Sequence, residues 1–131
     1  MIRKYNHIDF EAIDSNGLTF GFDIKMLEIM ENFTIESNGL PVCIISFIEY
    51  SPSKYTGFIY ADKKFNSLHA IELKTFVEQA RNMYNMTRFE TTSLDCNILN
   101  RWHSFLGFEC EGVKKNYIDN KDFRMWRMLW A

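Results

Sequence analysis

The sequence predicts a single-domain α/β (α+β) fold, with a mixed central sheet, helices on both faces of that sheet and a C-terminal β-hairpin. The 131 residues can bury one core but are too few for two, so we expect one domain over residues 1–131. Short apolar segments bounded by turn residues indicate strands, and longer segments with helical spacing separate them. Strand–helix–strand successions over residues 54–94 and 88–118 require crossovers, which place parallel strands in the sheet.

The first third of the chain is predicted to contain a strand and two helical segments. Residues 2–7 can form the strand, and a short helical turn is expected near Asp9 or Asp14. Asp23 is a suitable N-cap for a helix that would run to about Phe33. The apolar residues of this helix that recur at helical spacing, and are expected to face the core, are Met26, Ile29, Met30 and Phe33.

Three strands are expected to follow. The pair Asn38-Gly39 favours the positive φ angles of a tight turn, so it predicts a hairpin between residues 34–37 and 42–50. Residues 42–48 are almost continuously apolar, which is typical of a strand covered on both faces. After a turn at 51–53, Lys54–Ala61 is the next strand, and Gly57 inside it indicates a bulge or a close approach of another backbone.

The second half of the chain is predicted to alternate helices and strands. Ser67 can cap a helix to about Tyr84, and residues 88–94 form a strand. A second helix ends at Gly107, a residue that tolerates the positive φ of a helix C-cap. Residues 109–118 and 123–131 then form a hairpin around the polar turn 119–122, with Trp126 and Trp130 packed on one face of the last strand.

Composition excludes several classes of protein. The net charge of −2 gives no general attraction to nucleic acid or to an anionic membrane, and no apolar run reaches transmembrane length. The three cysteines are widely spaced, and the three histidines lack the spacing of metal ligands, so we expect neither a disulfide framework nor a metal site. With no signal peptide, the expected location is the cytoplasm, and neither nucleic acid nor membrane is an expected partner.

The last third of the sequence resembles the GNAT family of N-acetyltransferases. The matching residues, in order, are Leu106-Gly107-Phe108, Glu111-Gly112, Tyr117, the acidic turn 119–122 and Met125. The resemblance implies that acetyl-CoA lies in a V-shaped cleft between the strands 54–61 and 88–94, with its pyrophosphate at the N-terminus of the helix that follows the first strand. The residues that it implies for cofactor binding are Ile59, Tyr60, Ala61, Lys63, Lys64, Asn66, Ser67 and Asn97.

The sequence departs from the family pattern at two places. The loop of residues 61–69 contains no glycine, whereas the family has glycines that let the backbone approach the phosphates. His103 takes the position of the family's tyrosine, which protonates the leaving thiolate, so His103 is the candidate general acid. The alternative is a surface histidine on the helix face opposite Trp102. Cys96 stands in place of an asparagine, next to Asn97, and a packed thiol is a simpler interpretation of it than a nucleophile.

Two carboxylates are candidates for the general base by their positions at the cleft. Glu90 lies inside the strand 88–94, and Glu49 lies at the end of the long apolar strand. The alternative for each is a solvated carboxylate at a strand edge.

Two functions from different classes therefore remain open. The first is an acyl-CoA-dependent N-acyltransferase that moves an acetyl group to an amine of unknown identity. The second is a non-catalytic protein of the same fold, such as a phage virion-associated protein located in the host cytoplasm or the virion, with a protein partner or a second copy bound. An enzyme should have an open groove, free amides near Ser67 and His103 facing the groove. A structural protein should have the groove filled, with Phe65 or Tyr60 as candidates for filling it.

Overall fold

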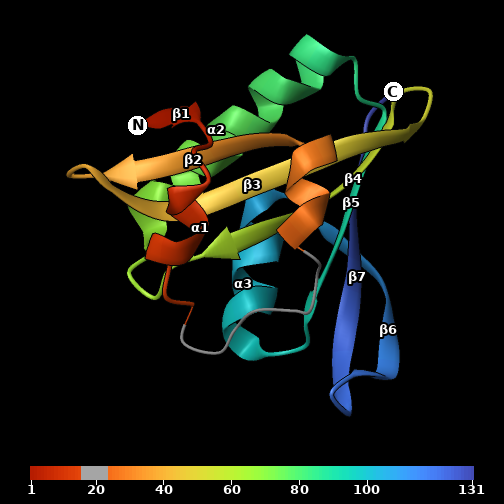
Figure 1. Cartoon of the computed structure of the whole chain (residues 1–131). Helices are drawn as coiled ribbons and strands as arrows, with labels where there is room; N and C mark the ends of the chain where they lie inside the picture. The colour runs from red at the N-terminus through yellow and green to blue at the C-terminus, as the bar shows by residue number, and fades with distance from the viewer. Residues whose placement is uncertain (16–23) are drawn as a thin grey trace.

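A single seven-stranded mixed sheet forms the centre of the molecule (Figure 1). The computed structural model describes residues 1–15 and 24–131. The strands follow the order β1-β2-β3-β4-β5-β7-β6, and β4 and β5 run parallel while the other described pairs are antiparallel. This confirms the predicted mixed sheet. The strands are β1 (Ile2–Lys4), β2 (Glu31–Ser37), β3 (Leu40–Ser51), β4 (Lys54–Ala61), β5 (Arg88–Leu94), β6 (Glu109–Ile118) and β7 (Lys121–Leu129).

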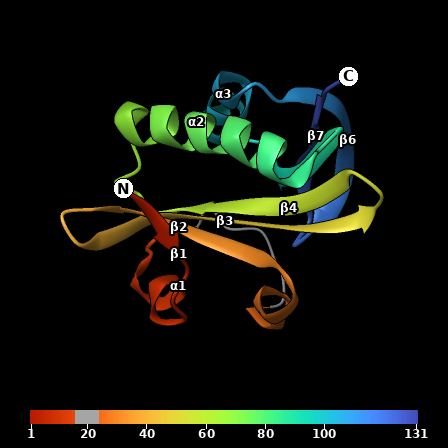
Figure 2. The same ribbon diagram turned by 90° about the horizontal axis from the view of Figure 1, so that it is seen from above.

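Helices cover both faces of this sheet, as predicted (Figure 2). On one face lie α2 (Ser67–Tyr84) and α3 (Asn97–Leu106), and on the other lie α1 (Ile8–Ala12) and the 3-10 helix η1 (Ile24–Ile29). The larger core fills the space between the sheet and α2 and α3, and its most buried members include Phe47, Leu73, Val77, Phe89 and Trp126. The smaller core, on the α1 side, consists of Ile13, Leu27, Ile44, Phe58 and Tyr60.

The helix expected from Asp23 to Phe33 is wrong beyond Ile29. Asp23 lies outside the described residues, and the helical segment is confined to η1. Phe33 instead belongs to β2, where it pairs with Ile45 of β3 and packs against the larger core. The backbone ladder to β3 therefore outweighs the helical spacing of this segment. As a result Leu27 is buried, whereas Met26 and Ile29, expected in the core, are exposed.

The first strand is also shorter than expected, because a buried carboxylate organises the turn behind it. Asp9 lies within α1 with 2% of its surface exposed and accepts two hydrogen bonds from Arg3, each of 2.8 Å. The backbone N–H of Asn6 and the hydroxyl of Thr34 donate to the same carboxylate. These bonds turn the chain away from the sheet after Lys4.

The second half of the chain follows the predicted elements with small shifts at their ends. Asn66, and not Ser67, is the N-cap of α2, because its side chain accepts hydrogen bonds from the first helical turn. Gly107 ends α3 with φ of 103°, as its position in the sequence predicts. Two residues with positive φ, Asp119 and Asn120, make the last hairpin turn, so β7 begins at Lys121 rather than Phe123.

Gly57 marks a close backbone approach and not a bulge. The pairing of β3 with β4 is regular at Phe47↔Gly57, and its irregularity falls between Glu49 and Ser51. A Cβ atom at Gly57 would lie 1.9 Å from the carbonyl oxygen of Ser46, so the position has no space for a side chain.

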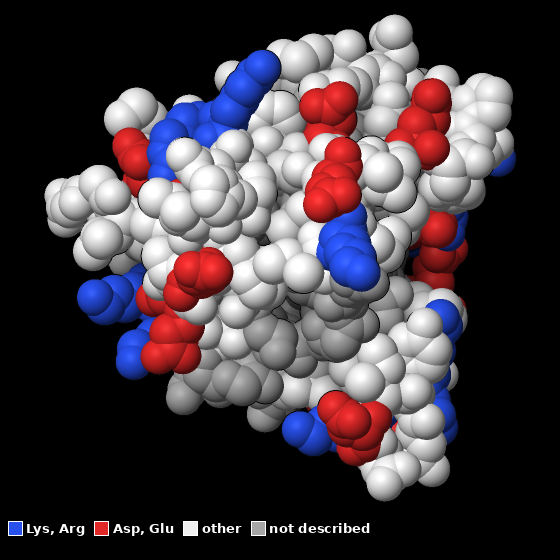
Figure 3. All heavy atoms as spheres, viewed as in Figure 1, with Lys and Arg blue, Asp and Glu red and all other residues white. Residues whose placement is uncertain are grey.

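Charges of both signs are intermingled on the face of the molecule shown in Figure 3. Ion pairs in and beside the sheet include those of Arg88 with Glu90 and of Arg124 with Asp95. No helix in the described part of the chain is long and apolar enough to cross a membrane.

Candidate active site

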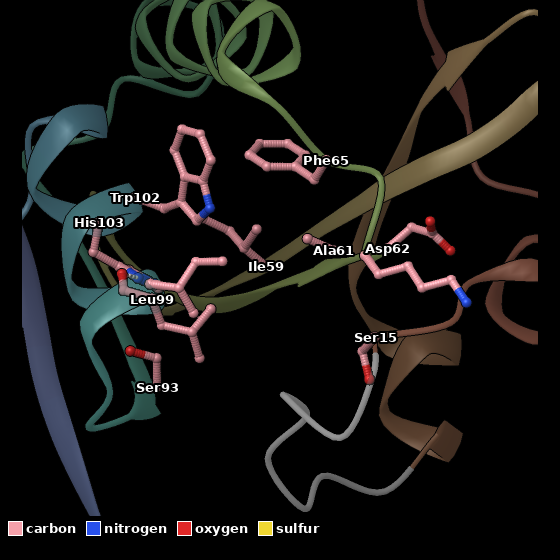
Figure 4. Close-up of a pocket in the computed structure, with 11 residues that line it drawn as sticks. Ser15, Ile59, Ala61, Asp62, Phe65, Ser93, Leu99, Trp102 and His103 are labelled. Carbon is pink, nitrogen blue, oxygen red and sulfur yellow. Dashed lines mark hydrogen bonds between the residues drawn. The ribbon is translucent and has the colours of Figure 1, made fainter.

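A cavity opens where the two parallel strands separate. The strands β4 and β5 pair from Lys54↔Arg88 to Gly57↔Thr91, and beyond this point both continue without pairing to each other. The cavity in the gap has a volume of about 130 Å³. Figure 4 shows its wall, to which β4 contributes Ile59 and Ala61, β5 contributes Ser93, and α3 contributes Leu99, Trp102 and His103.

His103 lies in this wall as a buried, neutral imidazole. Its exposed fraction is 4%, so the interpretation as a surface histidine is wrong. Its ring stacks on Trp126 with centroids 5.2 Å apart. Burial lowers its pKa from 6.5 to about 4, although a hydrogen bond to the Leu99 carbonyl acts in the opposite direction. His103 is therefore uncharged at neutral pH.

The hydrogen bond of His103 also sets which ring nitrogen carries the proton. Nδ1 lies 2.7 Å from the carbonyl oxygen of Leu99, and because a carbonyl can only accept, Nδ1 is the donor. The neutral ring then has a lone pair on Nε2, for which the described residues provide no hydrogen-bond partner. At neutral pH the Nε2 lone pair of His103 is available as an acceptor.

Ser93 is a functional candidate that the sequence reasoning missed. It is 2% exposed and accepts a hydrogen bond of 2.9 Å from the indole nitrogen of Trp126. Since the indole N–H is a donor only, the hydroxyl hydrogen of Ser93 is available, and the described residues offer it no acceptor. The alternation of β5 contained a signal, because Phe89, Thr91 and Ser93 share one strand face and two of these three residues are polar.

The two candidate carboxylates lie away from the cavity wall. Glu90 points to the opposite face of β5 from Ser93, where it binds Arg88 at 2.7 Å and accepts a hydrogen bond from the Tyr50 hydroxyl. Glu49 is exposed near the end of β3 and accepts a hydrogen bond of 3.0 Å from the Ser53 amide. The structure thus brings His103 and Ser93 together at the cavity, without either glutamate.

The loop between β4 and α2 has its backbone N–H groups occupied by the protein itself. The carboxylate of Asp62 accepts hydrogen bonds from the amides of Asp14 and Lys64, at 2.7 and 2.9 Å. The Lys63 amide donates to the Asp14 carbonyl, and the Phe65 amide donates to the Asp62 carbonyl.

A capping box continues this occupation into the first turn of α2. The Asn66 side chain accepts hydrogen bonds from the amides of Leu68 and His69, and the Asn66 amide donates to His69 Nδ1. Of residues 62–69 the Ser67 amide alone has no acceptor within the described chain. Of the free amides near Ser67 that an enzyme should have, the described chain leaves one. The loop therefore lacks the cluster of donors that the resemblance implies for a pyrophosphate.

The remaining residues implied for cofactor binding are dispersed around this loop. Ile59, Ala61 and Lys63 line the cavity, while Lys64 and Asn66 line a groove on the other side of the loop. Ser67 and Asn97 line a further groove beside α3.

Phe65 and Tyr60, the two candidates for filling the groove, lie on different sides of the sheet. Tyr60 is buried on the α1 side, where it stacks on Phe10 with centroids 4.8 Å apart. Phe65 does line the cavity and meets the edge of Trp102, as Figure 4 shows. The described side chains therefore leave part of the cavity open.

The described part of the molecule contains neither a disulfide nor a cluster of metal-binding side chains. Cys43 is buried, Cys96 is half-buried at the start of α3 and Cys110 is exposed, and all three are free thiols. Burial raises the pKa of the Cys43 thiol, which keeps it protonated. Among the described residues no three His, Cys, Asp or Glu side chains are placed to hold a metal ion.

Comparison with known proteins identifies the fold. No protein-family model and no curated protein matches the sequence. The structure matches a GNAT-family acetyltransferase from Streptococcus pneumoniae with a TM-score of 0.75 and 17% identity, over 100% of this chain and 99% of that one. A GNAT-family acetyltransferase from Bacillus anthracis matches with a TM-score of 0.73 and 20% identity, over 98% and 93% of the two chains. These likenesses show that the chain has the GNAT fold.

One further match was solved with coenzyme A bound. It is a ribosomal-protein N-acetyltransferase with a TM-score of 0.65 and 16% identity, over 76% of this chain and 62% of that chain. At this identity the likeness concerns the fold, and the chemistry must be argued from the cavity.

Proposed function

We propose that this protein transfers an acyl group from a pantetheine thioester, such as acetyl-CoA, to an amine. The observation that carries the proposal is the separation of β4 from β5 after Gly57, with His103 and Ser93 in the wall of the resulting cavity. The edge of β4 that faces β5 has no strand partner beyond this point, so the amide groups of a pantetheine arm can pair with it. The apolar residues of the wall exclude water from the thioester.

In the proposed reaction the amine nitrogen attacks the thioester carbon, so that an N–C bond forms and the C–S bond breaks. His103 Nε2 accepts the proton that the nitrogen loses from the tetrahedral intermediate. A buried imidazolium with a pKa of about 4 is a stronger acid than a thiol, whose pKa is about 8.5. The proton therefore moves on to the departing sulfur, which gives the amide and the free thiol. His103 acts first as acceptor and then as the acid that the resemblance implies.

Ser93 is proposed to stabilise the leaving thiolate. Trp126 fixes the Ser93 oxygen as an acceptor and leaves its hydrogen for a ligand in the cavity. A hydrogen bond from a fixed donor to a developing negative charge is worth more in a dry cavity than in water. With His103 so weak a base, the acceptor must enter as a neutral amine.

The competing proposal is a non-catalytic protein with the same fold, including a virion protein of a phage. The occupied amides of the loop support it, since they remove the usual phosphate site. The open cavity, with the polar groups of His103 and Ser93 in its wall, favours the transferase. A purely structural core would be expected to fill this space and pair both groups.

Titration calorimetry with acetyl-CoA and acetylpantetheine, followed by a screen of amine acceptors, tests the proposed function. We expect His103→Gln to lower turnover by about 10²- to 10⁴-fold, the range for loss of a general acid–base group. Ser93→Ala should lower it by about 10²-fold, as for one donor to a developing anion. His7→Gln, at an exposed position, is the control. Failure of both thioesters to bind at millimolar concentration would exclude the transferase.

A further inference from the structure

We propose that the acyl donor is recognised through its pantetheine arm alone, because Asp62 occupies the place of a nucleotide pyrophosphate. This inference rests on the proposed function and names its substrate class. The donors are acyl thioesters of a pantetheine arm, whether the arm is carried by a nucleotide, by a lone phosphate or by a carrier protein. Asp62 is the residue that determines this specificity.

The Asp62 carboxylate already performs the role of a bound anion. Its Oδ1 accepts from the Asp14 amide and its Oδ2 accepts from the Lys64 amide, so one carboxylate joins two segments of the chain. Phosphate groups are commonly bound by backbone N–H groups of a helix N-terminus and of the loop that leads into it, and Lys64 lies in the loop before α2. A phosphate arriving here would meet a negative charge that holds these donors.

The cationic side chain nearest to Asp62 in the sequence is also engaged. The Lys63 ammonium group lies 3.0 Å from the Asp14 carboxylate, and this pairing raises the pKa of Lys63. The Lys63 amide is bound to the carbonyl of the same Asp14. The amide and the ammonium group of Lys63 therefore both hold the segment after α1 in place, and a pyrophosphate would have to displace that segment to bind them.

The first turn of α2 adds a second internal acceptor. Asn66 Oδ1 binds the amides of Leu68 and His69, which leaves the Ser67 amide as the donor without an acceptor in the described chain. One amide is fewer than the cluster that a pyrophosphate normally requires. The part of the site proposed for the pantetheine arm differs from this loop, because the β4 edge is unpaired after Gly57 and the cavity beside it is open. The site thus accepts the arm and offers the diphosphate no cluster of free donors, so a diphosphate adds nothing to binding.

Comparison of three donors on the wild-type protein tests this inference directly. Calorimetry would measure Kd for acetyl-CoA, acetyl-4′-phosphopantetheine and acetylpantetheine. If the arm supplies the recognition, the three values should agree within about threefold, since each tenfold step needs a distinct additional interaction. Acetyl-CoA binding more than about tenfold tighter than acetylpantetheine would overturn the inference and leave the proposed function intact. Failure of all three to bind would overturn the proposed function itself.

An Asp62→Ser variant provides the second measurement. It removes the internal charge and releases the amides of Asp14 and Lys64, so acetyl-CoA should bind about tenfold more tightly while acetylpantetheine is unchanged. Asp119→Asn, which removes the same charge in the exposed β6–β7 turn, is the matched control and should alter neither value. No gain for acetyl-CoA in a folded Asp62→Ser protein would contradict the role of Asp62. If that variant does not fold, the wild-type comparison still decides.

A carrier protein loaded with the same acyl arm distinguishes the two sources of the donor. If the loaded carrier protein has a higher kcat/KM than acetyl-4′-phosphopantetheine, the donor is a carrier protein. If its kcat/KM is lower, the donor is a small thioester.

Discussion

His103 links the chemistry of the cavity to the stability of the fold. The folded protein keeps this imidazole neutral down to pH about 4, whereas the unfolded chain takes up a proton near pH 6.5. The unfolded state thus binds more protons between these values, so the free energy of unfolding falls as the pH is lowered from about 6.5 to about 4. The loss is at most about 3.5 kcal/mol, from roughly 1.4 kcal/mol per pKa unit.

Urea unfolding of the wild type and of His103→Gln at several pH values measures this effect. The variant should be less stable at pH 7 but should lose less stability on acidification. His7→Gln should keep the wild-type slope, because His7 is exposed. Equal slopes in the wild type and in His103→Gln would show that another group causes the acid sensitivity.

Gly57 is the residue at which the sheet admits no side chain. A Cβ atom would lie 1.9 Å from the Ser46 oxygen and 2.9 Å from the Phe47 Cα, and both are backbone atoms that cannot rotate away. We expect Gly57→Ala to lower the free energy of unfolding by about 3 kcal/mol or more. Gly112→Ala, which meets only the flexible end of Met125 at 3.1 Å, should cost far less. Chemical denaturation of both variants provides the comparison.

At the scale of elements, the N-terminus of α2 depends on Asn66. Its side chain satisfies two amides that the helix cannot satisfy itself. Asn66→Ala should lower the free energy of unfolding by about 1 kcal/mol, the usual cost of removing an N-cap. Asn82→Ala, on the exposed surface of the same helix, is the control. Identical urea midpoints for the two variants would mean that the cap contributes nothing.

The elements also show which features a sequence can predict. The Asn38-Gly39 hairpin and the Gly107 cap were predictable because each depends on the φ angles of its own residues. The η1–β2 segment was not, because Phe33 is held by pairing with Ile45 in another strand.

The same distinction applies to the candidate site. Its place at the separating strands followed from the order of elements and the resemblance. The orientation of Ser93 depends on Trp126, which lies 33 positions away, and the occupation of the loop joins Asp14 to Asp62 across 48 positions. Contacts between residues so far apart in the sequence cannot be predicted from the spacing of neighbouring residues.

At the scale of the whole molecule, the sheet consists of two parts that meet at one short seam. Strands β1 to β4 form one part and β5 to β7 form the other, and four residue pairs between β4 and β5 join them. From Lys54 to Gly57 the two strands are paired along the backbone. After Gly57 they are no longer paired, and side chains and the cavity lie between the two parts. A ligand whose arm extends the ladder would therefore complete the seam.

This architecture predicts where a bound thioester protects the backbone from hydrogen exchange. Acetylpantetheine should slow exchange of those amides in residues 58–61 that point away from β3, because a paired edge exchanges more slowly than an open one. Protection should extend to Ser93 across the cavity, while β1, at the far edge of the sheet, should exchange unchanged. Gly112→Ala, remote from the seam, should show the same pattern. Protection confined to β6 and β7, or spread evenly over all strands, would place the ligand elsewhere, because neither pattern arises from an arm that pairs with β4.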